Sequence, residues 1–253
     1  MTPTELQAHI AKTYFWLRGG LCVIAFVFPL WLLAVGWWKD IPLQASMSAY
    51  YFAFAPTTSD LRAFPGRVVF VGILFVVGFF LALYRGFSRT ENWALNLAGL
   101  SAIVVALFPT QTPLYCGNCG SNAYSSVVHG TAAAVLFVCI AFVAWACSEE
   151  TLVELPDRLR RRFRRAYFSL ATVMVLSPAA VIVMTNVFGV SDKKIFIAEW
   201  IGIATFAIYW ALKSYELSLS NAETRAIMGQ MPAMQAVQAG ELSLRQRAAR
   251  LLD

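Results

Sequence analysis

The chain of 253 residues is 59% hydrophobic and only 13% charged, with a mean hydropathy of +0.62 and a formal net charge of +6. A soluble domain is typically about half apolar and about a quarter charged, so this composition excludes an ordinary soluble protein. The 14% of aromatic residues also excludes a disordered or fibrous chain. The remaining class is a polytopic membrane protein.

Six segments are apolar enough to cross a bilayer, whose hydrocarbon core requires a helix of about 20 residues. They are Gly19–Trp38, Arg67–Tyr84, Ala94–Phe108, Ser125–Cys147, Tyr167–Phe188 and Ile195–Leu212. Helices satisfy their own backbone groups in lipid. We therefore expect an all-α integral membrane protein, with a six-helix transmembrane domain over residues 1–217 and a helical tail over residues 218–253. The first segment reads as an uncleaved signal anchor, because its apolar run is longer than a signal peptide's.

The lysines and arginines outside these segments are distributed unequally between the two sides of the membrane. One side holds fifteen of them, namely Lys12, Arg18, Arg85, Arg89, Arg158, Arg160, Arg161, Arg162, Arg164, Arg165, Lys213, Arg225, Arg245, Arg247 and Arg250. The other side holds five, Lys39, Arg62, Arg67, Lys193 and Lys194. Cytoplasmic loops carry the excess of positive charge, so both termini are expected in the cytoplasm of a multi-pass inner-membrane protein.

Six arginines are clustered in the predicted loop between the fourth and fifth spans. They are Arg158, Arg160, Arg161, Arg162, Arg164 and Arg165. Such a cluster beside a membrane attracts anionic headgroups by about 1 kcal/mol per residue. Nucleic-acid binding is the rival interpretation, but no nucleic-acid-binding fold surrounds the cluster, so anionic lipid is the expected partner. The weakly amphipathic segment Glu241–Leu252 lies on the same leaflet, contacts a partner, or is a frayed helix without one.

The predicted outer loops contain two further features. Residues 39–66 are too short and polar to span the membrane, and too aromatic for a solvated loop, so we expect them to lie along the interface or to fold back over the helices. Cys116 and Cys119 lie in the loop between the third and fourth spans. A structural disulfide is the favoured interpretation and a free pair the alternative. A redox motif would need a βαβ unit, and a zinc site would need two more ligands.

Two ionisable residues inside the predicted spans mark a candidate site, because such residues are costly in lipid and are by default functional. His129 in the fourth span and Glu199 in the sixth each lie about four residues, or about 6 Å, inside the outer end of their helix. Thr185 and Asn186 belong to the same layer. The outer loop supplies polar groups above it, Ser46, Ser48, Tyr50 and Tyr51. We therefore predict a polar pocket with His129, Glu199 and Asn186 as its floor and residues 46–51 as its lid.

The chemistry expected of this pocket is metal-independent and uses no cofactor. His129 is the candidate general base, Glu199 the group that orients it, and Ser48 or a water molecule the candidate nucleophile. One membrane histidine is too few for a catalytic zinc site. The alternatives are that a buried His129–Glu199 pair only holds two helices together, or that the two side chains do not contact each other.

Several motifs resemble an uncharacterised group of bacterial membrane proteins. They are residues 46–51 (SMSAYY), 67–72 (RVVFVG), 78–86 (GFFLALYRG), Glu91-Asn92, 96–99 (NLAG), 106–110 (ALFPT) and His129-Gly130. The group is similar to the Frag/DRAM/Sfk-like superfamily of six-helix proteins, which includes a eukaryotic GPI-anchor lipid-remodelling factor. The resemblance covers roughly residues 46–150 and, loosely, the last two spans through Glu199-Trp200. It implies six spans with cytoplasmic termini, and a site shared by the histidine and the acid.

The leading functional prediction is a membrane protein that binds or processes a lipid in an outer-leaflet pocket between the fourth and sixth spans. As an enzyme it would be a lipid hydrolase or an acyl-transfer enzyme. The alternative is a non-enzymatic structural or regulatory subunit that docks partners through its basic loop and tail. A small transporter is disfavoured, since no midplane charge or broken helix pair is present.

Overall fold

The computed structural model describes residues 3–52, 65–110, 123–189 and 193–228, and within these ranges every regular element is a helix. The elements are α1 (Pro3–Trp38), the 3₁₀ turn η1 (Ser48–Tyr51), α2 (Pro65–Leu83), α3 (Arg89–Leu107), α4 (Ala123–Phe142), the π-helical turn η2 (Val143–Cys147), α5 (Glu149–Leu152), α6 (Asp157–Asn186), α7 (Lys193–Ser220) and α8 (Ala222–Ile227).

Six helical segments are long and apolar enough to span a membrane, which confirms the predicted number of spans. They are α1, α2, α3, the continuous run of α4 through η2 into α5, α6 and α7. Three of them exceed the predicted bounds by eight residues or more. α1 begins at Pro3 instead of Gly19, α6 begins at Asp157 instead of Tyr167, and α7 ends at Ser220 instead of Leu212. Hydropathy detects only the apolar part of a helix, so it does not reveal the polar turns that continue it.

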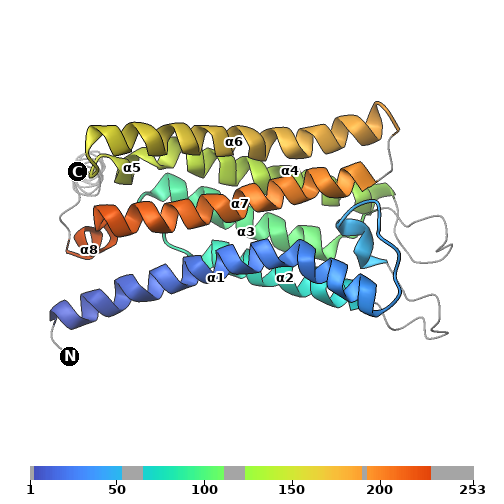
Figure 1. The fold of residues 1–253 in the computed structure, drawn as a ribbon, viewed down its shortest axis with the longest axis horizontal. Coiled ribbons are helices and arrows are strands. Elements are labelled where there is room, and N and C mark those ends of the chain that lie inside the picture. Colours follow the sequence, from blue (N-terminus) through green and yellow to red (C-terminus); the bar gives the residue numbers. More distant parts are fainter. Residues whose placement is uncertain (1–2, 53–64, 111–122, 190–192, 229–253) are drawn as a thin grey trace, which may run out of the picture.

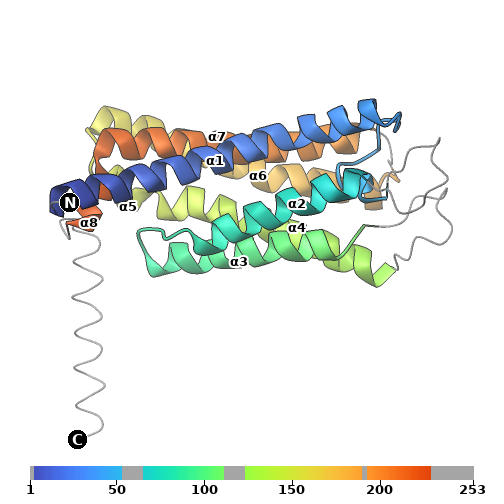
Figure 2. The ribbon, with the colours of Figure 1, turned by 90° about the horizontal axis from the view of Figure 1, so that it is seen from below.

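The six long helices form a closed ring in which each contacts two neighbours. The order around the ring is α1, α2, α3, α4, α6, α7 and back to α1. All six run along the length of the molecule (Figures 1 and 2). α6 lies on the opposite side of the bundle from α1 and α2 (Figure 1). The start of α1 and α8 lie at one end of the bundle, here called the α8 end, and η1 lies at the other, the η1 end (Figure 1).

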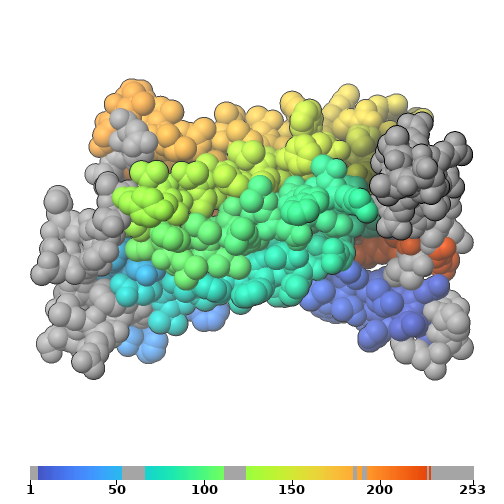
Figure 3. Space-filling view, turned by 180° about the vertical axis from the view of Figure 1, so that it is seen from behind, coloured from blue at the N-terminus to red at the C-terminus, as the bar shows by residue number. Residues whose placement is uncertain are grey.

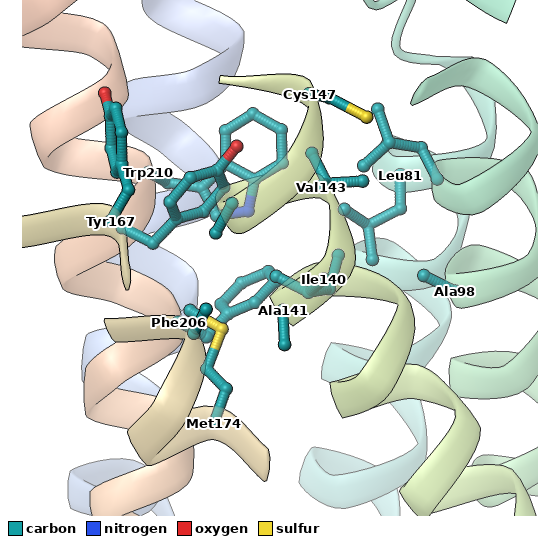
Figure 4. Close-up of a cluster of buried hydrophobic side chains, with 14 of the residues drawn as sticks. Leu81, Ala98, Ile140, Ala141, Val143, Cys147, Tyr167, Met174, Phe206 and Trp210 are labelled. Carbon is teal, nitrogen blue, oxygen red and sulfur yellow. The ribbon is translucent and has the colours of Figure 1, made fainter. Parts of the chain in front are cut away.

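The interior of the ring is filled by side chains from all six helices. Leu81 and Ala98 face Ile140 across the middle of the bundle, and Met174 and Phe206 close it from the other side (Figure 4). Each of these side chains is buried. The outward faces carry exposed apolar residues such as Phe26, Trp31 and Leu100, as expected of helices that face lipid.

α2 and α3 approach each other at a pair of glycines. A Cβ on Gly78 would lie 2.8 Å from the carbonyl oxygen of Gly99, and a Cβ on Gly99 would lie 2.5 Å from the carbonyl oxygen of Gly78. Small residues allow this approach between membrane helices. Gly130 lies in a small-residue stretch of α4 and is exposed. A Cβ added to it would meet no atom within 4 Å, so Gly130 does not mediate a close contact between helices.

The start of α3 is fixed by a reciprocal cap. Ser88 Oγ accepts a hydrogen bond from the backbone N–H of Glu91, and the Glu91 carboxylate accepts one from the N–H of Phe87. This arrangement satisfies backbone donors that a helix start leaves without partners. Glu91 is therefore buried, not part of a solvated turn.

Candidate functional site

At the η1 end, the chain after α1 turns back over the bundle. Ile41 N–H bonds to Gly36 O at 2.8 Å, and Asp40 between them adopts a left-handed conformation with φ of 52°. This bond pattern is a Schellman motif, which ends a helix and reverses the chain. It directs the following residues across the ends of the helices, as the aromatic content of the loop predicted.

Two hydrogen bonds attach this segment to the first turns of α7. Phe196 N–H donates to Ala45 O at 2.9 Å, and Met47 N–H donates to Glu199 Oε2 at 2.5 Å. We call this pair of bonds the α7 clasp. It supplies hydrogen-bond partners for backbone groups that would otherwise be unsatisfied in an apolar layer. Glu199 therefore has a structural role, to hold the segment above it.

The two serines of the segment are bonded to each other and to the backbone. Ser46 Oγ accepts from Ala49 N–H at 3.1 Å and lies 3.1 Å from Ser48 Oγ. Ser46 thus supports the turn of η1, as serine does at many turns. Ser48 is buried beside it.

Both tyrosines of η1 are held by aromatic and cationic neighbours. Tyr50 is buried against Phe196, with ring centroids 6.2 Å apart, and burial raises the pKa of its hydroxyl. Arg67 lies 4.4 Å from the centroid of the Tyr51 ring and donates from Nε to Tyr51 O at 3.0 Å. These contacts lock the segment in place over α2.

His129 of α4 contacts the end of α3. Its Nδ1 lies 2.7 Å from Phe108 O and 3.2 Å from Val105 O, and its ring stacks on Phe70 at an interplanar angle of 18°. A carbonyl oxygen only accepts, so Nδ1 carries the proton and the basic lone pair is on Nε2. The last carbonyls of a helix need such partners, so His129 completes the end of α3.

The predicted residues are thus only partly brought together. Residues 46–51 do lie over Glu199, but no hydrogen bond in the described part of the chain joins His129 to Glu199 or to Ser48. The predicted pair has separate partners because equal depth does not fix the direction in which a side chain leaves its helix. Thr185 and Asn186 are in the last turn of α6, and their side chains lie outside the described residues, as do Cys116 and Cys119.

A second polar centre, which the sequence did not reveal, lies at the α8 end. The guanidinium of Arg18 in α1 is only 1% exposed. Its Nε donates to Ser214 Oγ and its Nη1 to Tyr84 Oη, each at 3.2 Å, and Nη1 also pairs with Glu223 of α8. One buried cation therefore connects α1, α7, α8 and the residue that follows α2.

Lys213 of α7 forms the other half of this centre. Its Nζ donates to Glu216 Oε2 at 2.7 Å and to Thr151 Oγ1 at 2.6 Å, and Tyr167 donates to the same carboxylate oxygen at 2.9 Å. Lys213 is 3% exposed and Glu216 is fully buried. These bonds join α5, α6 and α7. Arg18 and Lys213, which the charge count placed in solvated loops, are therefore buried, and the last span continues past Glu216.

The arginine cluster divides between two faces of α6. Arg160 and Arg164 both bond to Glu149 Oε2, at 3.0 and 2.8 Å. The other four are exposed and form no ion pair with any described residue: Arg158, Arg161, Arg162 and Arg165. Their spacing of three, four and seven residues places them on one face, here called the arginine stripe.

Among the described residues, no group of three or more histidine, cysteine, aspartate or glutamate side chains could hold a metal ion. Comparisons of the chain with protein-family models, with curated proteins and with solved structures found no match.

Proposed function

We propose that this protein is a structural or regulatory membrane subunit that binds anionic lipid headgroups at the cytoplasmic surface through the arginine stripe. The observation that carries this proposal is the division of the cluster. Arg160 and Arg164 pair with Glu149, whereas the four stripe arginines are exposed on one face of α6. Cations held at fixed spacing on a helix are a suitable surface for phosphate groups.

The position of the stripe along α6 supports the same proposal. Arg165 lies 21 residues before Asn186, the end of the helix, which is about 30 Å along the axis and equals the thickness of the hydrocarbon core. Arg158 lies about 10 Å further on. The stripe thus extends from the membrane boundary through the headgroup layer. The excess of basic residues predicts that this end is cytoplasmic, where anionic lipids attract such segments.

Two double variants with the same change of charge test the proposal. The protein is reconstituted in nanodiscs of equal phosphatidylglycerol and phosphatidylcholine, and the retained lipids are counted by native mass spectrometry. Arg161→Gln/Arg165→Gln removes half of the stripe and should lower the enrichment of phosphatidylglycerol several-fold, since each arginine contributes about 1 kcal/mol. Arg160→Gln/Arg164→Gln should preserve the enrichment and lower the thermal stability, because it breaks the pairs to Glu149. Equal enrichment in both variants contradicts the proposal.

A second candidate is a lipid that is bound or processed at the outer leaflet. It is favoured by one observation: the α7 clasp holds residues 45–47 above Glu199 at the η1 end. His129→Ala and Glu199→Gln, compared separately for lipid composition and thermal stability, discriminate the alternatives. Altered lipids with intact stability support this candidate. Loss of stability alone, or no effect of either variant, argues against it.

A further inference from the structure

A cavity of about 250 Å³ lies between α1 and α2 near the α8 end. Its walls are apolar and are formed by Leu17 and Leu21 of α1 and by Phe79 and Leu83 of α2. Leu17, Phe79 and Leu83 are exposed at its rim, so the cavity opens toward the surrounding lipid. The space-filling view shows the bundle hollowed on this face, between the dark blue first half of α1 and the blue-green α2 and α3 (Figure 3).

One end of this groove is polar. Arg18 and Tyr84 line it, and Tyr14 packs edge-to-face on Tyr84 with ring centroids 5.7 Å apart. Arg18 uses Nε and Nη1 for its bonds to Ser214, Tyr84 and Glu223, but its Nη2 has no hydrogen-bond partner among the described residues. An unsatisfied guanidinium nitrogen is costly at the edge of a bilayer. Arg18, at the polar end of the groove, thus carries a buried donor that lacks an acceptor.

The groove lies at the depth where a phospholipid changes from chain to headgroup. Trp37 and Trp38 end α1 at the η1 end and are highly exposed, as tryptophans at a membrane interface are. Arg18 lies 20 residues before Trp38, which is about 30 Å along the helix and equals the hydrocarbon thickness. Arg18 is thus at the opposite interface, and Leu21 and Phe79 lie on its hydrocarbon side.

The charge around the polar end favours an anion. Glu223 already neutralises Arg18, but the next residue after Tyr84 is Arg85, which is exposed and forms no ion pair with a described residue. Arg85 therefore places a second, exposed cation directly after Tyr84, a residue that lines the groove. A group that carries one negative charge and several acceptor oxygens matches Arg18, Tyr84 and Arg85 together.

From these observations we infer that the α1–α2 groove is a binding site for one anionic glycerophospholipid, with an acyl chain against Leu17, Leu21 and Phe79 and its phosphate oxygens at Arg18, Tyr84 and Arg85. Mixed sites of this kind, with apolar walls and a few polar groups that fix the ligand, are typical of small-molecule pockets. The site goes beyond the proposed function, since α1 and α2 lie on the opposite side of the bundle from the arginine stripe (Figure 1).

Filling the groove tests the inference. Leu17→Trp narrows the cavity, and Leu30→Trp is a matched control, because both leucines lie on α1 and both are 42% exposed. The full chain is reconstituted in nanodiscs of equal phosphatidylglycerol and phosphatidylcholine and transferred to mild detergent, and tightly retained lipids are measured by native mass spectrometry. The wild type and Leu30→Trp should retain one phosphatidylglycerol, and Leu17→Trp should lose it at least fivefold, with thermal midpoints unchanged.

Headgroup recognition is tested separately with Arg85→Gln, which leaves the apolar walls and Arg18 intact. It should retain a lipid but reduce the preference for phosphatidylglycerol over phosphatidylcholine at least threefold.

The stripe variant Arg161→Gln/Arg165→Gln should keep the tightly bound lipid, so failure of the stripe proposal and failure of this site are distinguishable. The inference is overturned if the wild type retains no lipid, if it retains both headgroups equally, or if Leu30→Trp loses the lipid as Leu17→Trp does. If Leu17→Trp unfolds, Leu83→Trp at the rim replaces it.

Discussion

Buried ion pairs in this protein connect helices that are far apart in the sequence. Lys213 and Glu216 are both buried, and Thr151 and Tyr167 form hydrogen bonds with them from two other helices. Removal of one partner leaves an uncompensated charge, which costs far more than the intact pair contributes. We therefore expect the loss of one member of the pair to destabilise the protein more than the loss of both.

Lys213→Met should lower the free energy of unfolding by about 3 kcal/mol, because it leaves Glu216 buried without its cation. The double variant Lys213→Met/Glu216→Gln should recover at least half of this loss, since no charge remains and Tyr167 keeps an oxygen acceptor. Unfolding in mixed micelles, followed by circular dichroism, measures both. Lys12→Met, at an exposed position of α1, is the control. A double variant that is less stable than the single one contradicts the argument.

One of the two hydrogen bonds of the α7 clasp is accepted by a carboxylate oxygen of Glu199. Glu199→Ala should destabilise the protein by about 1–3 kcal/mol and speed hydrogen exchange at the Met47 amide, because a buried N–H loses its acceptor. Glu199→Gln retains an acceptor oxygen and should leave the exchange rate close to that of the wild type. Equal protection of the Met47 amide in all three proteins would show that the clasp does not hold the segment.

At the scale of the helix, close contact between α2 and α3 depends on the absence of side chains. Gly99→Ala should cost about 1–3 kcal/mol, because its Cβ would lie 2.5 Å from a backbone oxygen of Gly78, which cannot move without shifting α2. Gly72→Ala on α2 meets no atom within 4 Å and should change stability by less than about 1 kcal/mol. Thermal unfolding of the two variants provides the comparison. Similar midpoints would mean that the two helices do not depend on this contact.

The helices themselves were predictable because each carries its apolar run in one continuous segment. Their ends were not, because α1, α6 and α7 extend through polar turns whose partners are distant in sequence. Arg18, for example, bonds to Ser214 and Glu223. A hydropathy window treats such a residue as a solvated cation, since it has no information about the helix that will satisfy it.

The part of the candidate site that was predictable is the position of residues 46–51 over Glu199. His129 and Glu199 were expected in one layer, and residues 46–51 were expected above it. The sequence does not specify the rotation of each helix about its axis. The structure places the His129 ring against the end of α3 and the Glu199 carboxylate against the backbone of Met47. The groove beside Arg18 was not predictable, because it arises where α1 and α2 diverge.

For the whole molecule, the distribution of basic residues predicts which end of the bundle faces the cytoplasm. In a variant without its native cysteines, Arg161→Cys at the α8 end should react with a membrane-impermeant maleimide only after the cells are permeabilised. Leu43→Cys, which is exposed at the η1 end, should react in intact cells, provided the outer layers of the envelope admit the reagent. Reaction at Arg161→Cys in intact cells would reverse the predicted orientation.

The selection of anionic lipid by the whole molecule is tested by comparing the lipids that it retains with those of the bilayer around it. The wild-type protein is placed in nanodiscs of equal phosphatidylglycerol and phosphatidylcholine, and the ratio of the two retained lipids is determined by native mass spectrometry. The arginine stripe and the groove at Arg18 together predict a ratio several times that of the bulk bilayer. A retained ratio equal to the bulk ratio would contradict the account.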